Sequence, residues 1–280
     1  MAMSKGVTSA ILVVAVIVAF VVGVYSHPYI FPPTVEPEKP EDSVWAGVVD
    51  RGVIRVGSSP DWPPYEYLEA GEFTGFEVEL LEMIADRLGL EVEWVEMGFD
   101  LIIPEVKDMA IDLGVSGFSV YTERMAVVQF TMPHSITEGQ IITLKSKSDA
   151  LGITEIASVA ELDALGLTCG AQVGTTQQAE LQEEAPRALK TYEDYLVALE
   201  DLKRGALDSI YAETPVTSWW MLEAEKAGEE QLVVIYRRPY WPVAFVAHRD
   251  ADILVDKIDG TLAEIIAEGK LDELKAKWRS

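Results

Sequence analysis

Apolar residues in this chain alternate between the strand period and the helix period. Val53 to Gly57 is typical of a buried strand that ends in a glycine turn. Phe76 to Leu88 repeats its apolar residues at helical spacing, whereas Leu90 to Val95 alternates as a strand does. A short helix over Leu101 to Lys107 and a buried strand over Leu113 to Ser116 follow. This order predicts a parallel, doubly wound α/β sheet that binds ligands at the carboxyl ends of its strands.

The same pattern starts again after Lys147. The expected elements are strands over 167–173 and 208–212, helices over 176–183 and 195–204, and a long helical stretch over 253–278. Typical domains contain about 100–200 residues. A chain of 280 residues with an N-terminal tail therefore predicts two α/β lobes.

The N-terminus contains an apolar stretch from Gly6 to Tyr25 without a charged residue. A helix of about 20 residues would span about 30 Å, the thickness of a bilayer core. Lys5 precedes the stretch and an acidic segment follows it, so the positive-inside rule places the globule outside the cytoplasm. We expect residues 1–25 to be a membrane anchor or an uncleaved signal. Cleavage between Lys5 and Gly6 is an alternative that would leave the anchor intact.

A linker rich in proline and glutamate separates this stretch from the globule. Residues 26–43 include Pro28, Pro32, Pro33, Pro37 and Pro40. Proline keeps such a segment extended and semi-rigid. We expect a spacer between membrane and globule, with the globule beginning near Val44.

Composition narrows the range of partners. The net charge of −25 argues against nucleic acid or acidic lipid, because both require a basic face. Cys169 is the single cysteine, so no disulfide can form within the chain, and the three histidines lack metal-ligand spacing. We expect no cofactor and no metal. The absence of asparagine favours a thermophilic source, with genomic composition bias as the alternative.

Six segments then carry a resemblance to a known family. They are Ile54-Arg55-Val56-Gly57 with Asp61-Trp62-Pro63-Pro64-Tyr65-Glu66; Gly75-Phe76-Glu77-Val78-Glu79-Leu80; Phe99-Asp100-Leu101-Ile102-Ile103-Pro104; Asp112 to Ser119 with Thr122-Glu123-Arg124; Gly174-Thr175-Thr176; and Gly205-Ala206-Leu207-Asp208 with Glu213-Thr214-Pro215. In this order the chain resembles the type II periplasmic solute-binding proteins, family 3, of polar amino-acid ABC importers. The resemblance covers nearly the whole globule, from about Asp50 to Trp278.

The resemblance implies two doubly wound, Rossmann-like lobes joined by two hinge strands. Lobe one is expected over 44–139 and 243–280, and lobe two over 140–242. The hinges would lie near 137–143 and 234–242.

The resemblance also implies a site for a free amino acid. Arg124 occupies the position of the family's carboxylate-binding arginine, and a guanidinium can donate two parallel hydrogen bonds to a carboxylate. Ser119 and Thr176 are expected to donate backbone N–H groups and hydroxyls, with Thr175 beside them at the helix start. Simple helix capping is the alternative for the hydroxyls. Gly117 would bring its carbonyl close to the ligand ammonium.

The remaining positions concern the ammonium and the side chain of the ligand. Glu213 would bind the ammonium, although most family members have aspartate there. Trp62 and Phe99 would flank the ligand, unless they belong to the lobe core. Gln172 is expected to contact the polar end of the ligand. Ser59 lies where members that bind basic amino acids often have an acid, which argues against lysine or arginine, although Asp61 and Asp100 are nearby in sequence. A neutral polar amino acid such as glutamine is expected.

The function implied is capture of a free amino acid outside the cytoplasm, on the extracellular or periplasmic side, and delivery to the permease and ATPase of an ABC importer. The protein is expected to be a monomer that is tethered to the membrane by its N-terminal helix. An enzyme on the same fold, of the cyclohexadienyl dehydratase type, is one alternative. A ligand-sensing domain is another.

Overall fold

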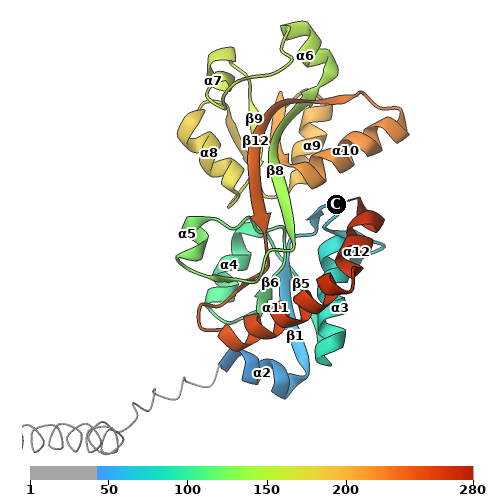
Figure 1. The fold of residues 1–280 in the computed structure, drawn as a ribbon. Coiled ribbons are helices and arrows are strands. Elements are labelled where there is room, and N and C mark those ends of the chain that lie inside the picture. The colour runs from blue at the N-terminus through green and yellow to red at the C-terminus, as the bar shows by residue number, and fades with distance from the viewer. Residues whose placement is uncertain (1–42, 280) are drawn as a thin grey trace, which may run out of the picture. The chain divides into compact units, whose positions relative to one another are not determined.

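The computed structural model describes residues 43–279, which form two α/β lobes (Figure 1). The sheet of lobe one has the strand order β5-β1-β6-β13-β7, and that of lobe two has the order β10-β9-β11-β8-β12. A small three-stranded sheet, β2-β3-β4, is formed by the segment that follows β1. The predicted anchor and linker lie outside the described residues, apart from Ser43. Over residues 43–279, no helix has the length and apolar character needed to cross a bilayer.

The elements of lobe one come from both ends of the described chain. Its strands are β1 (Val53–Ser58), β2 (Asp61–Trp62), β3 (Glu66–Glu69), β4 (Glu72–Thr74), β5 (Glu91–Glu96), β6 (Leu113–Gly114), β7 (Gln129–Phe130) and β13 (Val246–Ala247). Its helices are α2 (Ser43–Arg51), α3 (Phe76–Leu88), α4 (Phe99–Lys107), α5 (Thr122–Met125), α11 (Asp252–Ala267) and α12 (Lys270–Trp278).

Lobe two is built from the intervening segment. Its strands are β8 (Ser135–Leu144), β9 (Cys169–Gln172), β10 (Leu189–Tyr192), β11 (Ser209–Glu213) and β12 (Leu232–Val243). Its helices are α6 (Lys145–Leu151), α7 (Glu161–Leu165), α8 (Thr176–Glu184), α9 (Tyr195–Lys203) and α10 (Thr214–Ala227).

Both main sheets are mixed, which corrects the expectation of purely parallel sheets. In lobe one, β1 is parallel to β5 and β6, whereas β13 runs antiparallel to β6 and β7. In lobe two, β9 is parallel to β10 and β11, and β8 runs antiparallel to β11 and β12. The antiparallel strands are those that leave one lobe or return to it. The alternation of strands and helices along the sequence predicts parallel neighbours. It does not predict the direction of strands that pass from one lobe to the other.

Two long strands connect the lobes. β8 and β12 pair from Ser135 with Val243 to Leu144 with Leu232, and Figure 1 shows them side by side between the lobes. They contain the segments where the hinges are expected. The lobe boundaries at 139/140 and 242/243, and rotation of the lobes about these strands, stay predictions.

Helix ends follow from local sequence. α3 ends where Gly89 adopts φ 70, a left-handed conformation that glycine accepts without strain. α4 begins at Phe99, two residues before the predicted start. The predicted stretch over 253–278 is two helices, because Gly269 lies between them with φ 76.

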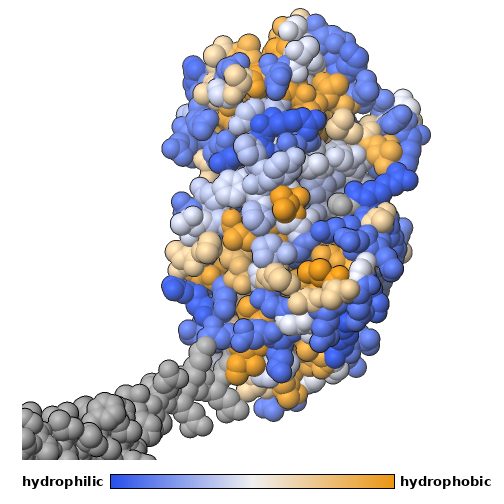
Figure 2. Space-filling model, viewed as in Figure 1, coloured by the Kyte–Doolittle hydropathy of each residue, from blue (hydrophilic) through white to orange (hydrophobic). Residues whose placement is uncertain are grey.

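Buried apolar side chains continue from one lobe to the other. The largest cluster includes Trp62 and Tyr65 of lobe one together with Tyr195 and Trp220 of lobe two. On the face seen in Figure 2, hydrophobic residues form scattered groups among hydrophilic ones. Because the side chains of the cluster are buried, the apolar contact between the lobes is internal, next to the cavity described below.

Candidate functional site

A cavity lies between the lobes. All nine residues predicted to bind a ligand line it, namely Trp62, Phe99, Gly117, Ser119, Arg124, Gln172, Thr175, Thr176 and Glu213. Four further residues line it as well, namely Asp61, Ser116, Gln177 and Tyr195. These residues lie near the carboxyl ends of strands and the starts of helices, as the fold class predicts. The role of each residue toward a ligand stays a prediction.

Arg124 brings a buried positive charge to the cavity. It lies in the four-residue helix α5, and its side chain is 9 % exposed. Its guanidinium donates hydrogen bonds to the carbonyl oxygens of Ser119 at 3.2 Å and Gly174 at 3.1 Å. Burial lowers the pKa of Arg124 to about 10, so it stays protonated at neutral pH.

The guanidinium of Arg124 has aromatic neighbours and no direct ion pair, although the charge of Glu213 on the same cavity raises its pKa against the effect of burial. Its central carbon lies 5.3 Å from the ring centres of both Phe99 and Phe118, which stack on each other. Among residues 43–279, no carboxylate forms an ion pair with it. A guanidinium has five N–H donors, and the two carbonyls occupy only part of them. The group is therefore free to receive a carboxylate.

Glu213 brings a buried negative charge from lobe two. It is the last residue of β11, and its side chain is 4 % exposed. One carboxylate oxygen accepts hydrogen bonds from Ser119 at 2.8 Å and Gln177 at 2.9 Å, and the other accepts one from Thr137 at 2.5 Å. These donors are neutral, so within the described chain the charge of Glu213 has no basic partner in an ion pair.

Gly117 is required by the close approach of an aromatic ring. Its φ of 58 is left-handed, and a Cβ at this position would lie 2.0 Å from a ring atom of Trp62. Its N–H donates to Glu77 at 2.9 Å. Glycine at this position therefore lets Trp62 cover the loop after β6, in addition to the close approach to a ligand that the sequence predicts.

Glu77 belongs to a buried chain of titratable groups behind the cavity. Its carboxylate lies 2.8 Å from Nε2 of His134, and both side chains are fully buried. Glu66 is hydrogen-bonded to Glu77, and burial together with the charge of Glu77 raises the pKa of Glu66 well above its ordinary value. Ser116 donates to Glu66 at 3.3 Å and also lines the cavity. These groups hold the loop from Ser116 to Gly117 in place.

The start of α8 faces the cavity from lobe two. Thr175 is its N-cap, and the Thr175 hydroxyl accepts the N–H of Gln178 at 3.1 Å and donates to the carbonyl of Gln172 at 2.7 Å. The hydroxyl that caps α8 is therefore that of Thr175, and not that of Thr176, for which capping is the stated alternative. The hydroxyl of Thr176 donates to the side chain of Gln177 at 3.2 Å.

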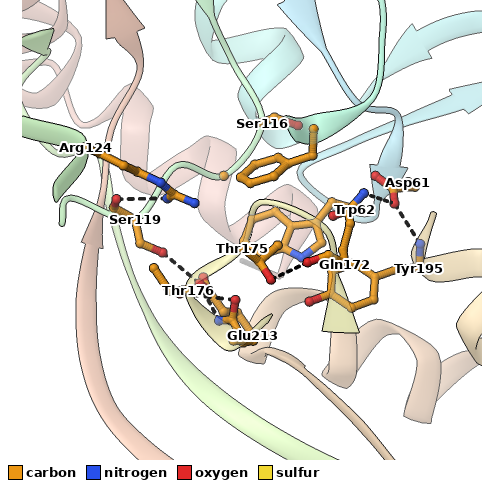
Figure 3. A pocket seen from close by; sticks show the side chains of 13 residues that line it. Asp61, Trp62, Ser116, Ser119, Arg124, Gln172, Thr175, Thr176, Tyr195 and Glu213 are labelled. Carbon is orange, nitrogen blue, oxygen red and sulfur yellow. Dashed lines mark hydrogen bonds between the residues drawn. The ribbon is translucent and has the colours of Figure 1, made fainter. Parts of the chain in front are cut away.

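Asp61 is the charged residue that the sequence-based site omits. It is 4 % exposed, and it accepts hydrogen bonds from Ser59 at 2.8 Å, from the side chain of Gln172 at 2.8 Å and from the N–H of Tyr195 at 2.9 Å. Burial raises the pKa of Asp61 to about 6. Figure 3 shows Asp61 and Arg124 at opposite ends of the cavity.

The other omitted residues differ in how far the sequence indicates them. Ser116 and Gln177 adjoin Gly117 and Thr176, so the motifs that identify their neighbours could have included them. Tyr195 begins α9 and belongs to none of the six segments, so no sequence signal indicates it.

Known proteins resemble this chain in sequence and in structure. The chain is 28 % identical over 229 residues to ABC transporter arginine-binding protein 1 of Escherichia coli (strain K12). The matched region covers 80 % of this chain and 90 % of that relative. A solved structure of a mutant of ArgBP from T. maritima superposes with a TM-score of 0.76 at 28 % identity, covering 84 % of this chain and 98 % of that one.

A further solved structure is similar and bears on the enzymatic alternative. It is the ancestral amino acid-binding protein AncCDT-1, described as a precursor of cyclohexadienyl dehydratase. Its TM-score is 0.74 at 26 % identity, with 84 % of this chain and 99 % of that chain covered. The family model of the bacterial extracellular solute-binding proteins, family 3, matches residues 54–280. The chain belongs to that family.

Proposed function

We propose that this protein binds a free amino acid between its lobes, outside the cytoplasm, and delivers it to an ABC importer. The observation that carries the proposal is the pair Arg124 and Glu213. They are opposite charges, both buried on one cavity, and neither has an ion-pair partner within the described chain. A buried unpaired charge is costly, and a zwitterion supplies the missing partner to each.

The ligand would be oriented by these two charges. Its carboxylate accepts paired hydrogen bonds from Arg124, and N–H groups at Ser119 and Thr176 add donors. Its ammonium donates to Glu213 and to the carbonyl of Gly117. Trp62 and Phe99 exclude water from these contacts, which strengthens each of them.

Closure would couple binding to delivery. Arg124 lies on lobe one and Glu213 on lobe two, so a ligand that contacts both favours the closed form. The permease and ATPase of the importer would recognise this form. The E. coli relative is named as an arginine-binding protein of an ABC transporter, which supports an amino-acid cargo and this partner. Tethering by residues 1–25 and a monomeric state belong to the same proposal.

A thermal-shift screen of the full-length chain tests the proposal. The protein is unfolded and refolded to remove carried ligand, then heated with each common amino acid. Ligand at 1,000 times its dissociation constant adds about 4 kcal/mol of stability, which raises the midpoint by several degrees. A shift with one or a few amino acids supports the proposal. A folded sample that shifts with none of them contradicts it.

The dehydratase alternative has its own test. A carboxyl group on the cavity, such as Glu213 or Asp61, could act as a general acid, and AncCDT-1 is similar in structure. Incubation with cyclohexadienyl acids should give no turnover if the protein only binds its ligand. Product formation that is lost in Glu213→Gln would favour the enzyme instead.

A further inference from the structure

Two acidic side chains and one basic side chain line the cavity, so one negative charge remains when a zwitterion pairs with the other two groups. Arg124 is the only basic residue among those that line it within the described chain, whereas Glu213 and Asp61 are both acidic. A ligand carboxylate takes Arg124 and a ligand ammonium takes Glu213. Asp61 is then left as a buried carboxylate bonded only to neutral donors, which does not neutralise its charge.

The position of Asp61 shows which part of a ligand would meet it. Arg124 and Glu213 define the end of the cavity that holds the α-carboxylate and α-ammonium. Asp61 lies at the other end, beside Trp62 and Tyr195 (Figure 3). The side chain of the ligand therefore extends toward Asp61.

A second, outer groove between the lobes has the same charge preference. Asp61 lines this groove as well as the cavity, so it lies at the boundary between them. Glu96 of lobe one and Glu193 and Asp194 of lobe two also line the groove, and no lysine or arginine does so among the described residues. An acidic approach of this kind concentrates cations and repels anions.

We propose that Asp61 determines specificity by pairing with a cationic side chain, so that the ligand is a basic amino acid. The inference rests on the proposed function, since it assumes that an α-amino acid occupies the cavity. It replaces the expectation of a neutral ligand, which follows from the neutral Ser59. In the structure Ser59 donates its hydroxyl to Asp61, so the acid of this pocket lies two residues further along the chain.

A purely structural role for Asp61 makes a different prediction. Asp61 on lobe one accepts bonds from Gln172 and Tyr195 on lobe two, and it could serve only to hold the lobes together. Asparagine at this position keeps an acceptor oxygen of the same size but removes the charge. Asp61→Asn therefore separates the two roles, because only the specificity role predicts that cationic ligands are affected selectively.

The experiment compares arginine with citrulline, its neutral counterpart of nearly the same shape, by calorimetric titration of the refolded full-length chain. The unmodified protein should bind arginine about tenfold or more tightly than citrulline, as expected for a buried charge pair. Asp61→Asn should bring the two affinities within about threefold, since no charge then distinguishes the ligands. Asp250→Asn, at a side chain that is 86 % exposed, removes the same charge from the surface and should leave the ratio unchanged.

The outcomes separate this inference from the proposed function. Tight binding of glutamine or citrulline, with arginine no better, overturns the role of Asp61 and leaves amino-acid binding intact. Failure to bind any amino acid overturns both. A strong preference for arginine that persists in Asp61→Asn assigns the specificity to another group. The comparison on the unmodified chain needs no variant, so it decides the ligand class even if Asp61→Asn does not fold.

Discussion

Single residues on the cavity combine burial with charge, and this combination makes their effects testable. Arg124→Ala should weaken amino-acid binding by about tenfold or more, because the ligand carboxylate loses its partner in a cavity that excludes water. Calorimetric titration measures the change. Arg204→Ala is the matched control, since Arg204 is 69 % exposed and pairs with Asp201 on the surface. Equal affinities in Arg124→Ala and the unmodified chain would show that the ligand carboxylate lies elsewhere.

Asp61 predicts a pH dependence of specificity. Its pKa of about 6 means that it gains a proton as the pH falls below 6 and then no longer attracts a cation. The preference for arginine over citrulline should therefore decrease from pH 8 to pH 5. The titratable groups that interact with Asp61 are Asp194, Glu66 and Tyr195.

Titrations at the two pH values with the unmodified protein and Asp61→Asn isolate the effect. The preference should change with pH only where Asp61 is present. An equal change in Asp61→Asn would assign the titration to another group.

Glu66 predicts a pH dependence of stability. Its folded pKa lies above its ordinary value, so from about pH 4.5 upward the folded chain keeps a proton that the unfolded chain has lost. Stability then falls as pH rises toward the folded pKa, by up to about 1.4 kcal/mol per pH unit for one proton. Glu66→Gln, which keeps a donor toward Glu77, should lack this contribution.

Urea unfolding of Glu66→Gln and of the unmodified protein at pH 4.5 and pH 8 tests this expectation. Relative to the unmodified protein, the free energy of unfolding of Glu66→Gln should be higher at pH 8 than at pH 4.5. A constant difference would mean that Glu66 is ionised in the folded protein. Because the comparison is made at each pH, contributions from Asp61 cancel.

Individual site residues were predictable where a motif positions them. Arg124, Gly117 and Glu213 were identified because they stand in segments that resemble the family, and all three line the cavity. Asp61 was not, although it stands in a quoted segment, because sequence does not show that its side chain points into the cavity and reaches lobe two. Tyr195 contributes a backbone N–H to Asp61, a contact between residues 134 positions apart that depends on how the lobes meet.

At the scale of elements, the spacing of hydrophobic residues predicted the bounds of helices better than the direction of strands in the sheets. α3 has the predicted bounds, because its apolar face and the glycine after it are local signals. The family resemblance implies two hinge strands where β8 and β12 lie, but the antiparallel direction of β8, β12 and β13 was not predicted, since it depends on partners that are distant in sequence. The predicted helix over 253–278 is divided at Gly269, a residue whose left-handed conformation the apolar period does not reveal.

The loop after β6 depends on glycine for packing as well as for conformation. Gly117→Ala should lower the free energy of unfolding and weaken ligand binding, because its Cβ would lie 2.0 Å from the Trp62 ring. Gly166→Ala is the matched control: its φ of 68 is also left-handed, but nothing lies within 4 Å of an added Cβ. Gly166→Ala should lower the free energy of unfolding by only about 1 kcal/mol, from conformational strain, and should leave ligand affinity unchanged. Similar losses of stability and affinity in both variants would show that the Trp62 contact is unimportant.

The whole molecule combines a net charge of −25 with an acidic groove that leads to the cavity. These charges should attract a cationic ligand, and salt screens such attraction over about 10 Å at 0.1 M. The association rate of arginine, followed by the change in tryptophan fluorescence after rapid mixing, should fall as ionic strength rises from 0.01 M to 0.5 M.

Citrulline carries no net charge, so its association rate should change little over the same range. Replacing Glu96 and Glu193 by glutamine should reduce the salt dependence for arginine, with Asp250→Asn as the surface control. A salt dependence that persists in the double variant would assign the attraction to the overall charge rather than to the groove. Rates for arginine and citrulline that respond equally to salt would indicate that closure of the lobes, and not encounter, limits association.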